Sequence, residues 1–301
     1  MPTTMSERTA GFALGVGAYI SWGVLPLYLR LLKGVPAAQV LAHRVLWSLV
    51  LLLGLIFVLK RGRALIAAAR GRTLLLLVGS ATLIGINWLI YIWAAMNGHL
   101  LEASLGYFIN PLINVALGMA VLGERIRRWQ GVALSIAAAG VVVMAVGGGG
   151  AIWISLLLAT TFALYGLLRK VMAMDALGGL TIETLMIAPF AIAILINASQ
   201  TGTSGWGQSL WLDVLLALAG IVTAIPLLMF AAAARRMPLS TLGLLQYISP
   251  TLQFSVAVLV FREALHVENL ITFALIWAGC ALYAWDGLRS TRAAAMVPAE
   301  H

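Results

Sequence analysis

The chain has 301 residues, of which 62% are hydrophobic and only 10% are charged, and it carries a formal net charge of +9. A soluble protein has about 25% charged residues, so a soluble globular domain is excluded and most of the chain must be surrounded by lipid. The basic residues lie in short clusters between apolar stretches, which indicates membrane topology and not a nucleic-acid partner. The single cysteine, Cys280, excludes an intrachain disulfide and is interpreted as a small packing residue.

Apolar stretches that can cross a bilayer follow one another along the whole chain. A span needs about 20 residues, because each helical residue adds about 1.5 Å across a hydrocarbon core of about 30 Å. The first stretch is longer than the apolar core of a cleavable signal peptide, so we expect a retained helix there. We predict an all-α integral membrane protein with ten transmembrane helices, at residues 10–32, 37–59, 73–97, 101–122, 129–147, 151–171, 179–198, 210–234, 239–261 and 268–288.

Basic residues are divided unequally between the two ends of these helices. Only Arg30, Lys33 and Arg262 lie at the ends that we assign to the outer side, and Arg44 lies within a span. Lys and Arg accumulate on the cytoplasmic side of membrane proteins, so we predict that both termini are cytoplasmic. The residues assigned to the cytoplasmic side are Arg8, Lys60, Arg61, Arg63, Arg70, Arg72, Arg125, Arg127, Arg128, Arg169, Lys170, Arg235, Arg236, Arg289 and Arg292.

Two of the predicted helices resemble each other. The fourth contains Glu102–Glu124, which reads EASLGYFINPLINVALGMAVLGE, and the ninth contains Leu239–Glu263, which reads LSTLGLLQYISPTLQFSVAVLVFRE. The motif Phe-Ile-Asn-Pro that ends at Pro111 matches Tyr-Ile-Ser-Pro that ends at Pro250, and a glutamate follows each proline after the same interval. We interpret the two stretches as one helix in two copies of a repeat, and Glu124 as a structural tie to its arginine neighbours.

The positions of these two copies determine the symmetry of the chain. The fourth and ninth places give a repeat of five helices, and an odd number makes the second copy enter the membrane from the opposite side. We therefore predict two inverted repeats, at residues 1–147 and 148–290, joined near Gly147–Gly150 and followed by a short cytoplasmic tail at 291–301. Inverted repeats around a central site are typical of secondary transporters.

Ionisable residues within the second span need a physical reason, because burying one in a membrane costs about 2.5–3.5 kcal/mol. Arg44 cannot lose its proton, so it must reach water, a carboxylate or carbonyl groups. We interpret Arg44 as the anchor of an anionic group of a solute or as a structural partner, with snorkelling to the near surface as the alternative. His43 shares a helix face with Gln39 and Trp47, and we expect it to contact solute or relay a proton.

Glu183 occupies, in the second repeat, the place that His43 and Arg44 occupy in the first. One interpretation is that Glu183 pairs with a cation inside the bundle or binds a proton. The other is an interfacial carboxylate near the first turn of its helix, where the helix dipole favours a negative charge. Protons are accordingly a candidate coupling ion, with His43, Glu183 and Glu102 as candidate carriers.

Polar and aromatic side chains at membrane depth predict a cavity. Prolines inside helices leave a carbonyl free and permit a kink, so we predict that Pro111 and Pro250 form a pair of matched gates. Small and polar residues also let helices pack closely in lipid, and interfacial packing likewise stays the alternative for the aromatic residues. The candidate solute-binding residues are Tyr19, Trp22, His43, Arg44, Asn87, Tyr91, Tyr107, Asn110, Glu183, Gln246 and Tyr247.

Several chemistries have no motif in this chain. A phosphate-binding GxxxxGK[ST] loop and an HExxH metal motif are missing, and four histidines do not form a metal site. We therefore expect no cofactor and no metal, and a driving force from gradients or passive exchange. An intramembrane enzyme acting on lipid would need a nucleophile or metal set that is not visible, and a non-transporting scaffold is the third interpretation.

Six stretches resemble the RarD branch of the EamA family in the drug/metabolite transporter superfamily. They are HRVLWS (43–48), residues 101–128, LYGLLRK (164–170), IETL (182–185), AGIVTAIPLL (219–228) and LSTLGLLQYISPTLQF (239–254). The resemblance extends over residues 10–290 and implies ten helices in two inverted repeats in a bacterial inner membrane, with cytoplasmic termini. It also implies export or exchange of small solutes, such as an amphenicol-type drug, an amino acid or a related metabolite, by alternating access. It implies neither the site residues nor the oligomeric state.

Overall fold

The computed structural model describes residues 5–122, 127–146, 151–172, 174–237, 241 and 245–295, and every regular element in these ranges is a helix. Nine of the described helices are long and apolar enough to cross a membrane, and a shorter apolar helix covers Ile248–Val260. This confirms the predicted all-α membrane fold. The elements are α1 (Met5–Leu31), α2 (Ala37–Val58), α3 (Gly62–Ala68), α4 (Arg72–Met96), α5 (Leu100–Leu122), α6 (Arg128–Val146), α7 (Ile152–Val171), α8 (Ala176–Gln200), α9 (Leu210–Ala234), α11 (Ile248–Ser255), the π-helical η1 (Val256–Val260) and α12 (Val267–Ala295).

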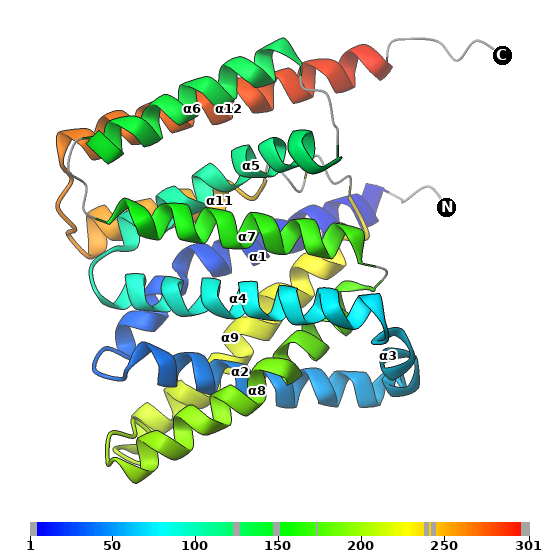
Figure 1. Cartoon of the computed structure of the whole chain (residues 1–301), viewed down its shortest axis with the longest axis vertical. Coiled ribbons are helices and arrows are strands. Elements are labelled where there is room, and N and C mark those ends of the chain that lie inside the picture. Colours follow the sequence, from blue (N-terminus) through cyan, green and yellow to red (C-terminus); the bar gives the residue numbers. More distant parts are fainter. Residues whose placement is uncertain are drawn as a thin grey trace.

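The long helices lie side by side, and the chain enters and leaves the bundle at the same end (Figure 1). The short α3 lies at this end too, between α2 and α4 (Figure 1). Arg61 precedes α3, Arg72 begins α4 and Arg169 lies in the last turn of α7. Arg30, in contrast, lies in the last turn of α1, at the opposite end of the bundle. The helix directions thus separate these basic residues as the sequence predicts.

The packing partners of the helices repeat with an inversion. Helix α4 packs on α7, and α9, its equivalent in the second repeat, packs on α1, the equivalent of α7. In the same way α5 packs on α7 while α11 packs on α1, and α2 packs on α9 while α8 packs on α4. The fifth and tenth spans, α6 and α12, pack mainly on each other at one edge of the bundle (Figure 1). The exchange of partners is what two inverted five-helix repeats require.

Glycines allow the helix backbones to approach closely. A Cβ atom added at Gly220 in α9 would lie 2.5 Å from the carbonyl carbon of Trp47 in α2. One added at Gly106 in α5 would lie 2.8 Å from the carbonyl oxygen of Ser155 in α7. Because lipid surrounds the helices, such van der Waals contact is a main source of helix association. The packing interpretation therefore holds for Gly106.

The ninth predicted span differs from its partner in the first repeat. Pro111 lies inside α5, whereas Pro250 lies in the first turn of α11, directly after turn residues Gln246 and Tyr247. A helix does not use the N–H groups of its first turn, so proline is tolerated there without a kink. The expected mid-helix position of Pro250 does not hold, and the gate role of both prolines stays a prediction. Residues 238–240 and 242–244, the join at 147–150 and Glu124 lie outside the described residues.

The close contact at Gly220 can be tested by adding one methyl group. We expect Gly220→Ala to lower the free energy of unfolding by about 1–3 kcal/mol, because α2 and α9 must separate to accept the new atom. Gly54→Ala in α2 is the matched control, since nothing lies within 4 Å of its added Cβ. The control should be neutral or stabilising by up to about 1 kcal/mol. Thermal unfolding in detergent measures both, and equal effects would contradict the packing at Gly220.

Candidate solute site

Arg44 lies inside the protein and not at its surface. Its side chain projects from α2, the residue is 7% exposed, and its guanidinium carbon is 4.6 Å from the ring centroid of Trp88 in α4. The Nε and Nη1 atoms are buried and have no hydrogen-bond partner among the described residues. None of the ion pairs that the described residues form involves Arg44. A guanidinium in this position does not snorkel, and it keeps hydrogen-bonding capacity for another group.

Three tyrosines from three helices lie near enough to this guanidinium to interact with its charge. Tyr28 in α1, Tyr91 in α4 and Tyr107 in α5 are all within electrostatic range of Arg44. The rings of Tyr91 and Tyr107 meet edge to face with centroids 5.7 Å apart. Tyr28 donates to the carbonyl oxygen of Leu215 at 2.6 Å, while the Tyr91 hydroxyl is buried without a partner among the described residues. The Arg44 cluster, which we define as Arg44, Trp88 and these three tyrosines, therefore has an aromatic wall and unused polar atoms.

Asn87 extends the cluster toward α7. The Tyr107 hydroxyl donates to Asn87 Oδ1 at 3.2 Å, and the Asn87 amide donates to Leu158 O at 2.9 Å and Thr161 Oγ1 at 3.0 Å. Asn87 is therefore engaged by α5 and α7, which makes it a positioning residue for Tyr107. The sequence pattern predicts Asn87 and Tyr91 as site residues. It does not identify Thr161, because nothing in the sequence distinguishes that position.

One face of α4 connects the Arg44 cluster with a second buried polar group. Ser80, Ile84, Asn87 and Tyr91 are buried and follow one another at steps of four, three and four residues. This spacing places them on a single helix face. Ser80 is not among the predicted site residues, although a small polar residue seven positions before Asn87 is a usable signal.

The second buried polar group is formed around Glu183 in α8. Glu183 is 1% exposed, and its Oε1 accepts a hydrogen bond from Ser80 at 2.6 Å. The Tyr165 hydroxyl donates to Oε2 at 3.3 Å, and Arg169 Nη1 lies 3.6 Å from Oε1. Glu183 therefore pairs with a cation, Arg169 in the last turn of α7, and it is buried beyond the first turn of α8.

The other candidate residues of α1 and α2 lie apart from the Arg44 cluster. Tyr19 and Trp22 form an aromatic group with Phe230 of α9, with ring centroids 5.5–6.0 Å apart. His43 stacks on Trp206 in the α8–α9 loop at 5.2 Å. The Gln39 amide fastens the same loop, since it donates to Thr203 O and accepts from Gly205 N, each at 2.9 Å. The face of α2 that carries Gln39 and His43 thus contacts the α8–α9 loop, whereas the Arg44 side chain lies in the interior of the protein.

The candidate residues of α5 and the ninth span meet through an aromatic contact. Phe108, and not Asn110, faces Tyr247, with stacked ring centroids 6.3 Å apart. Asn110 is buried and its Oδ1 has no partner among the described residues, whereas Gln246 is half-buried. Cys280 is buried beside them and donates to Phe108 O at 3.6 Å, which fits its interpretation as a packing residue.

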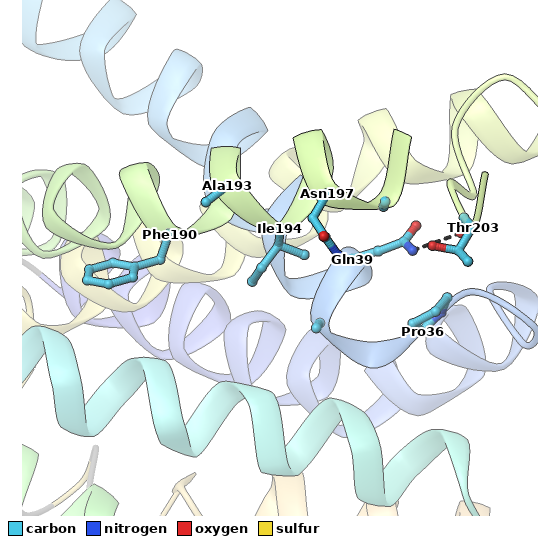
Figure 2. A pocket seen from close by; sticks show the side chains of 9 residues that line it. Pro36, Gln39, Phe190, Ala193, Ile194, Asn197 and Thr203 are labelled. Atoms are coloured by element: carbon cyan, nitrogen blue, oxygen red, sulfur yellow. Dashed lines mark hydrogen bonds between the residues drawn. The ribbon is translucent and has the colours of Figure 1, made fainter. Parts of the chain in front are cut away.

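Two hollows lie near the end of the bundle that holds the α1–α2 turn. Figure 2 shows the first, a groove of about 580 Å³ between α2 and α8, in which Gln39 points toward Thr203 and Phe190 lies at the far end. The second, which we call the vestibule, has a volume of about 430 Å³. Neither hollow is lined by Arg44. The vestibule is lined by Arg30, Lys33, Ala95, Met96, Asn97, Gly98, Phe261 and Glu263.

Glu263 in the vestibule joins the two halves of the chain. Its Oε1 accepts a hydrogen bond from Leu100 N at 2.9 Å, and its Oε2 accepts one from Leu101 N at 2.8 Å. The carboxylate thereby caps the first turn of α5, where free N–H groups and the helix dipole favour a negative charge. Burial raises the pKa of Glu263, and the nearby Glu102 adds to this effect, while the two backbone hydrogen bonds oppose it.

Comparison with known proteins gives the family. The EamA-like transporter family matches residues 9–146. A Vibrio cholerae protein named "Uncharacterized transporter" is 45% identical over 296 residues, which are 98% of each chain. "Protein RarD" of Salmonella typhi is 45% identical over 288 residues, which cover 95% of this chain and 98% of that protein. The chain belongs to the EamA-like transporter family, in its RarD branch. It is a multi-pass bacterial membrane permease of the drug/metabolite transporter type.

Other members of the RarD branch are more distant. A Pseudomonas aeruginosa protein named "Chloramphenicol-sensitive protein RarD" is 35% identical over 288 residues, which cover 94% of this chain and 96% of that one. A solved crystal structure that is 20% identical has a TM-score of 0.57 and covers 91% of this chain and 97% of its own. That likeness shows a shared fold.

The buried pair at Glu183 makes a prediction for stability. Glu183→Ala should lower the free energy of unfolding by about 3–5 kcal/mol, because Arg169 then remains as a largely buried cation without its partner. The double variant Glu183→Ala, Arg169→Ala should be destabilised by less than the sum of the two single variants. Unfolding in detergent measures the cycle, and strict additivity would show that the two side chains do not interact.

The Glu263 cap makes a prediction for the pH dependence of stability. Since the native pKa is raised, the native state holds this proton more tightly than the unfolded state. Its contribution is complete below the ordinary glutamate pKa of about 4.3 and is lost as the pH rises through the native pKa. Wild type should therefore lose stability relative to Glu263→Gln over this window, measured as the difference in melting temperature. A wild type that gains stability relative to Glu263→Gln as the pH rises would contradict the raised pKa.

Proposed function

We propose that this RarD-branch chain is a secondary permease that exports or exchanges small solutes across the bacterial inner membrane by alternating access. One observation carries the proposal, namely a buried Arg44 guanidinium with two unused nitrogens beside the unused Tyr91 hydroxyl. Unpaired buried polar groups are costly, and a buried charge is more so. A transporter meets this cost when a solute occupies the place of the missing partner during its cycle.

The polar face of α4 supports a route for the solute. It leads from the Arg44 cluster past Asn87 and Ser80 to Glu183. Movement of the two inverted repeats against each other would expose one end of this route and then the other. The amphenicol-type drugs, amino acids and related metabolites are the solute classes, and the Pseudomonas relative's name "Chloramphenicol-sensitive protein RarD" supports including amphenicols.

The sidedness and coupling belong to the same proposal. Arg61, Arg72 and Arg169 lie at the end of the bundle where the chain enters and leaves, so we assign that end to the cytoplasm. Protons are the proposed coupling ion, with Glu183 as the carrier that lies on the α4 route. The vestibule then opens on the outer side.

Flux through purified protein tests the permease. We expect proteoliposomes to exchange radiolabelled chloramphenicol or amino acids, and Arg44→Gln to reduce the rate at least tenfold by removing the charge at the site. Arg63→Gln is the matched control, since it removes the same charge from an exposed position on α3 and should leave the rate unchanged.

Two outcomes would contradict parts of the proposal. Equal rates in the Arg44 and Arg63 variants would move the solute site away from Arg44. Rates that change neither with the pH nor with an imposed proton gradient would exclude protons as the coupling ion, but would not contradict the permease function.

A further inference from the structure

We infer that the solute bound at Arg44 is an organic carboxylate, and that Arg30 and Lys33 collect this anion in the vestibule. The inference rests on the proposed permease function and narrows its solute class. It also separates the candidate solutes, because amino acids carry a carboxylate whereas amphenicols do not.

The two repeats differ in how the charge at one equivalent position is balanced. The interval between Arg44 and Glu183 equals the interval between Pro111 and Pro250, so the two charged residues occupy equivalent places. In the second repeat the negative Glu183 is balanced by Arg169 and receives hydrogen bonds from Ser80 and Tyr165. In the first repeat Arg44 has no described carboxylate partner. One negative charge is therefore missing at this place.

The polar atoms of the Arg44 cluster that lack a described partner are hydrogen-bond donors. Arg44 Nε and Nη1 can only donate hydrogen bonds, and the Tyr91 hydroxyl can donate a third. Planar guanidinium groups bind carboxylates through charge-assisted hydrogen bonds, which are about twice as strong as neutral ones. An ammonium solute would instead be repelled by the permanent charge of Arg44. The faces of Trp88 and the tyrosines suit an apolar or aromatic body next to the carboxylate.

The vestibule lies along α1 and α4, two of the helices that carry the Arg44 cluster. Arg30 follows Tyr28 by two residues in α1, and Ala95 follows Tyr91 by four residues in α4. The rise of a helix makes these steps about 3 Å and 6 Å. Measured along the helix axes, the vestibule therefore begins about one turn beyond the tyrosines of the Arg44 cluster, at the proposed outer end of the bundle, with Arg30 on the opposite face of α1 from Tyr28.

The charges in the vestibule attract anions. Arg30 and Lys33 are exposed, and the Arg30 guanidinium carbon lies 4.4 Å from the ring centroid of Phe261. The carboxylate of Glu263 also lines this space, but both of its oxygens are engaged by the first turn of α5. Neither Arg30 nor Lys33 forms an ion pair with another described residue, and two such cations at the mouth of a hollow raise the local concentration of anions and their rate of association.

Matched probes that differ in one charge test the carboxylate. We expect phenylacetate to raise the melting temperature of the purified full chain, and phenylacetamide, with the same ring and no charge, to have no effect. Benzoate, butyrate and succinate extend the panel to carboxylates with other carbon skeletons. For each carboxylate that binds, Arg44→Gln should weaken the apparent affinity at least tenfold, and Arg63→Gln should leave it unchanged.

Two further variants guard against a misfolded Arg44→Gln and test the vestibule. Tyr91→Phe keeps every charge and removes one hydroxyl, so it should weaken carboxylate binding several-fold. The double variant Arg30→Gln, Lys33→Gln should slow carboxylate association several-fold at low salt. The same variant should match wild type in about 0.5 M salt, where charges are screened beyond a few ångströms.

The outcomes separate this inference from the proposed function. Equal binding of acid and amide would overturn the carboxylate site, and so would a panel in which no carboxylate binds wild type more tightly than Arg44→Gln. Chloramphenicol flux that falls with Arg44→Gln, in a protein that binds no carboxylate at Arg44, would keep the permease and overturn the inference. Carboxylate binding that depends on Arg44, without flux of any bound carboxylate, would keep the anion site and overturn the permease.

Discussion

Lipid cannot form hydrogen bonds, and this constraint governs both the backbone and the polar side chains of the protein. Every backbone group within the hydrocarbon must find its partner inside its own helix, which is why all regular elements in the described ranges are helical. The same rule applies to polar side chains, which must satisfy one another. Glu183, Ser80, Tyr165 and Arg169 do so. Arg44 and Tyr91 do not, and neither do His43 Nε2, Asn110 Oδ1 and Gln253 Oε1. Among these groups only Arg44 carries a permanent charge, which is why we place the proposed site there.

The inverted repeats explain how such a difference arises. Two copies of one fold place equivalent residues at opposite depths, so a substitution in one copy changes one side of the membrane only. A carboxylate stands at this place in the second repeat and a guanidinium in the first. The carboxylate is held by its own repeat and by α4, whereas the guanidinium faces aromatic rings. We interpret the first arrangement as the place of the proposed proton carrier and the second as the proposed binding site.

Contacts between the repeats lie at the ends of the helices as well as along them. Glu263 of the second repeat caps α5 of the first through two backbone hydrogen bonds. The Gln39 amide of α2 fastens the α8–α9 loop. The alternating access that we propose would require some of these contacts to break while the closely packed helix pairs remain together, since packed interfaces shift between discrete arrangements. The end contacts are the natural candidates, because each involves only a few groups.

The sequence by itself determined the all-α membrane fold, the inverted repeats and the separation of the basic clusters. These properties depend on segment length, hydropathy and residue order, all of which are local. It could not determine which residues meet, because a helix in lipid is apolar on nearly all faces and its pattern does not show which face is internal. Only the tertiary structure separated Tyr19 and Trp22 from Arg44, joined Glu183 to Arg169 and moved Pro250 to the start of a helix. Helix rotation and pairing decide such contacts, and they depend on the close packing of all the helices together.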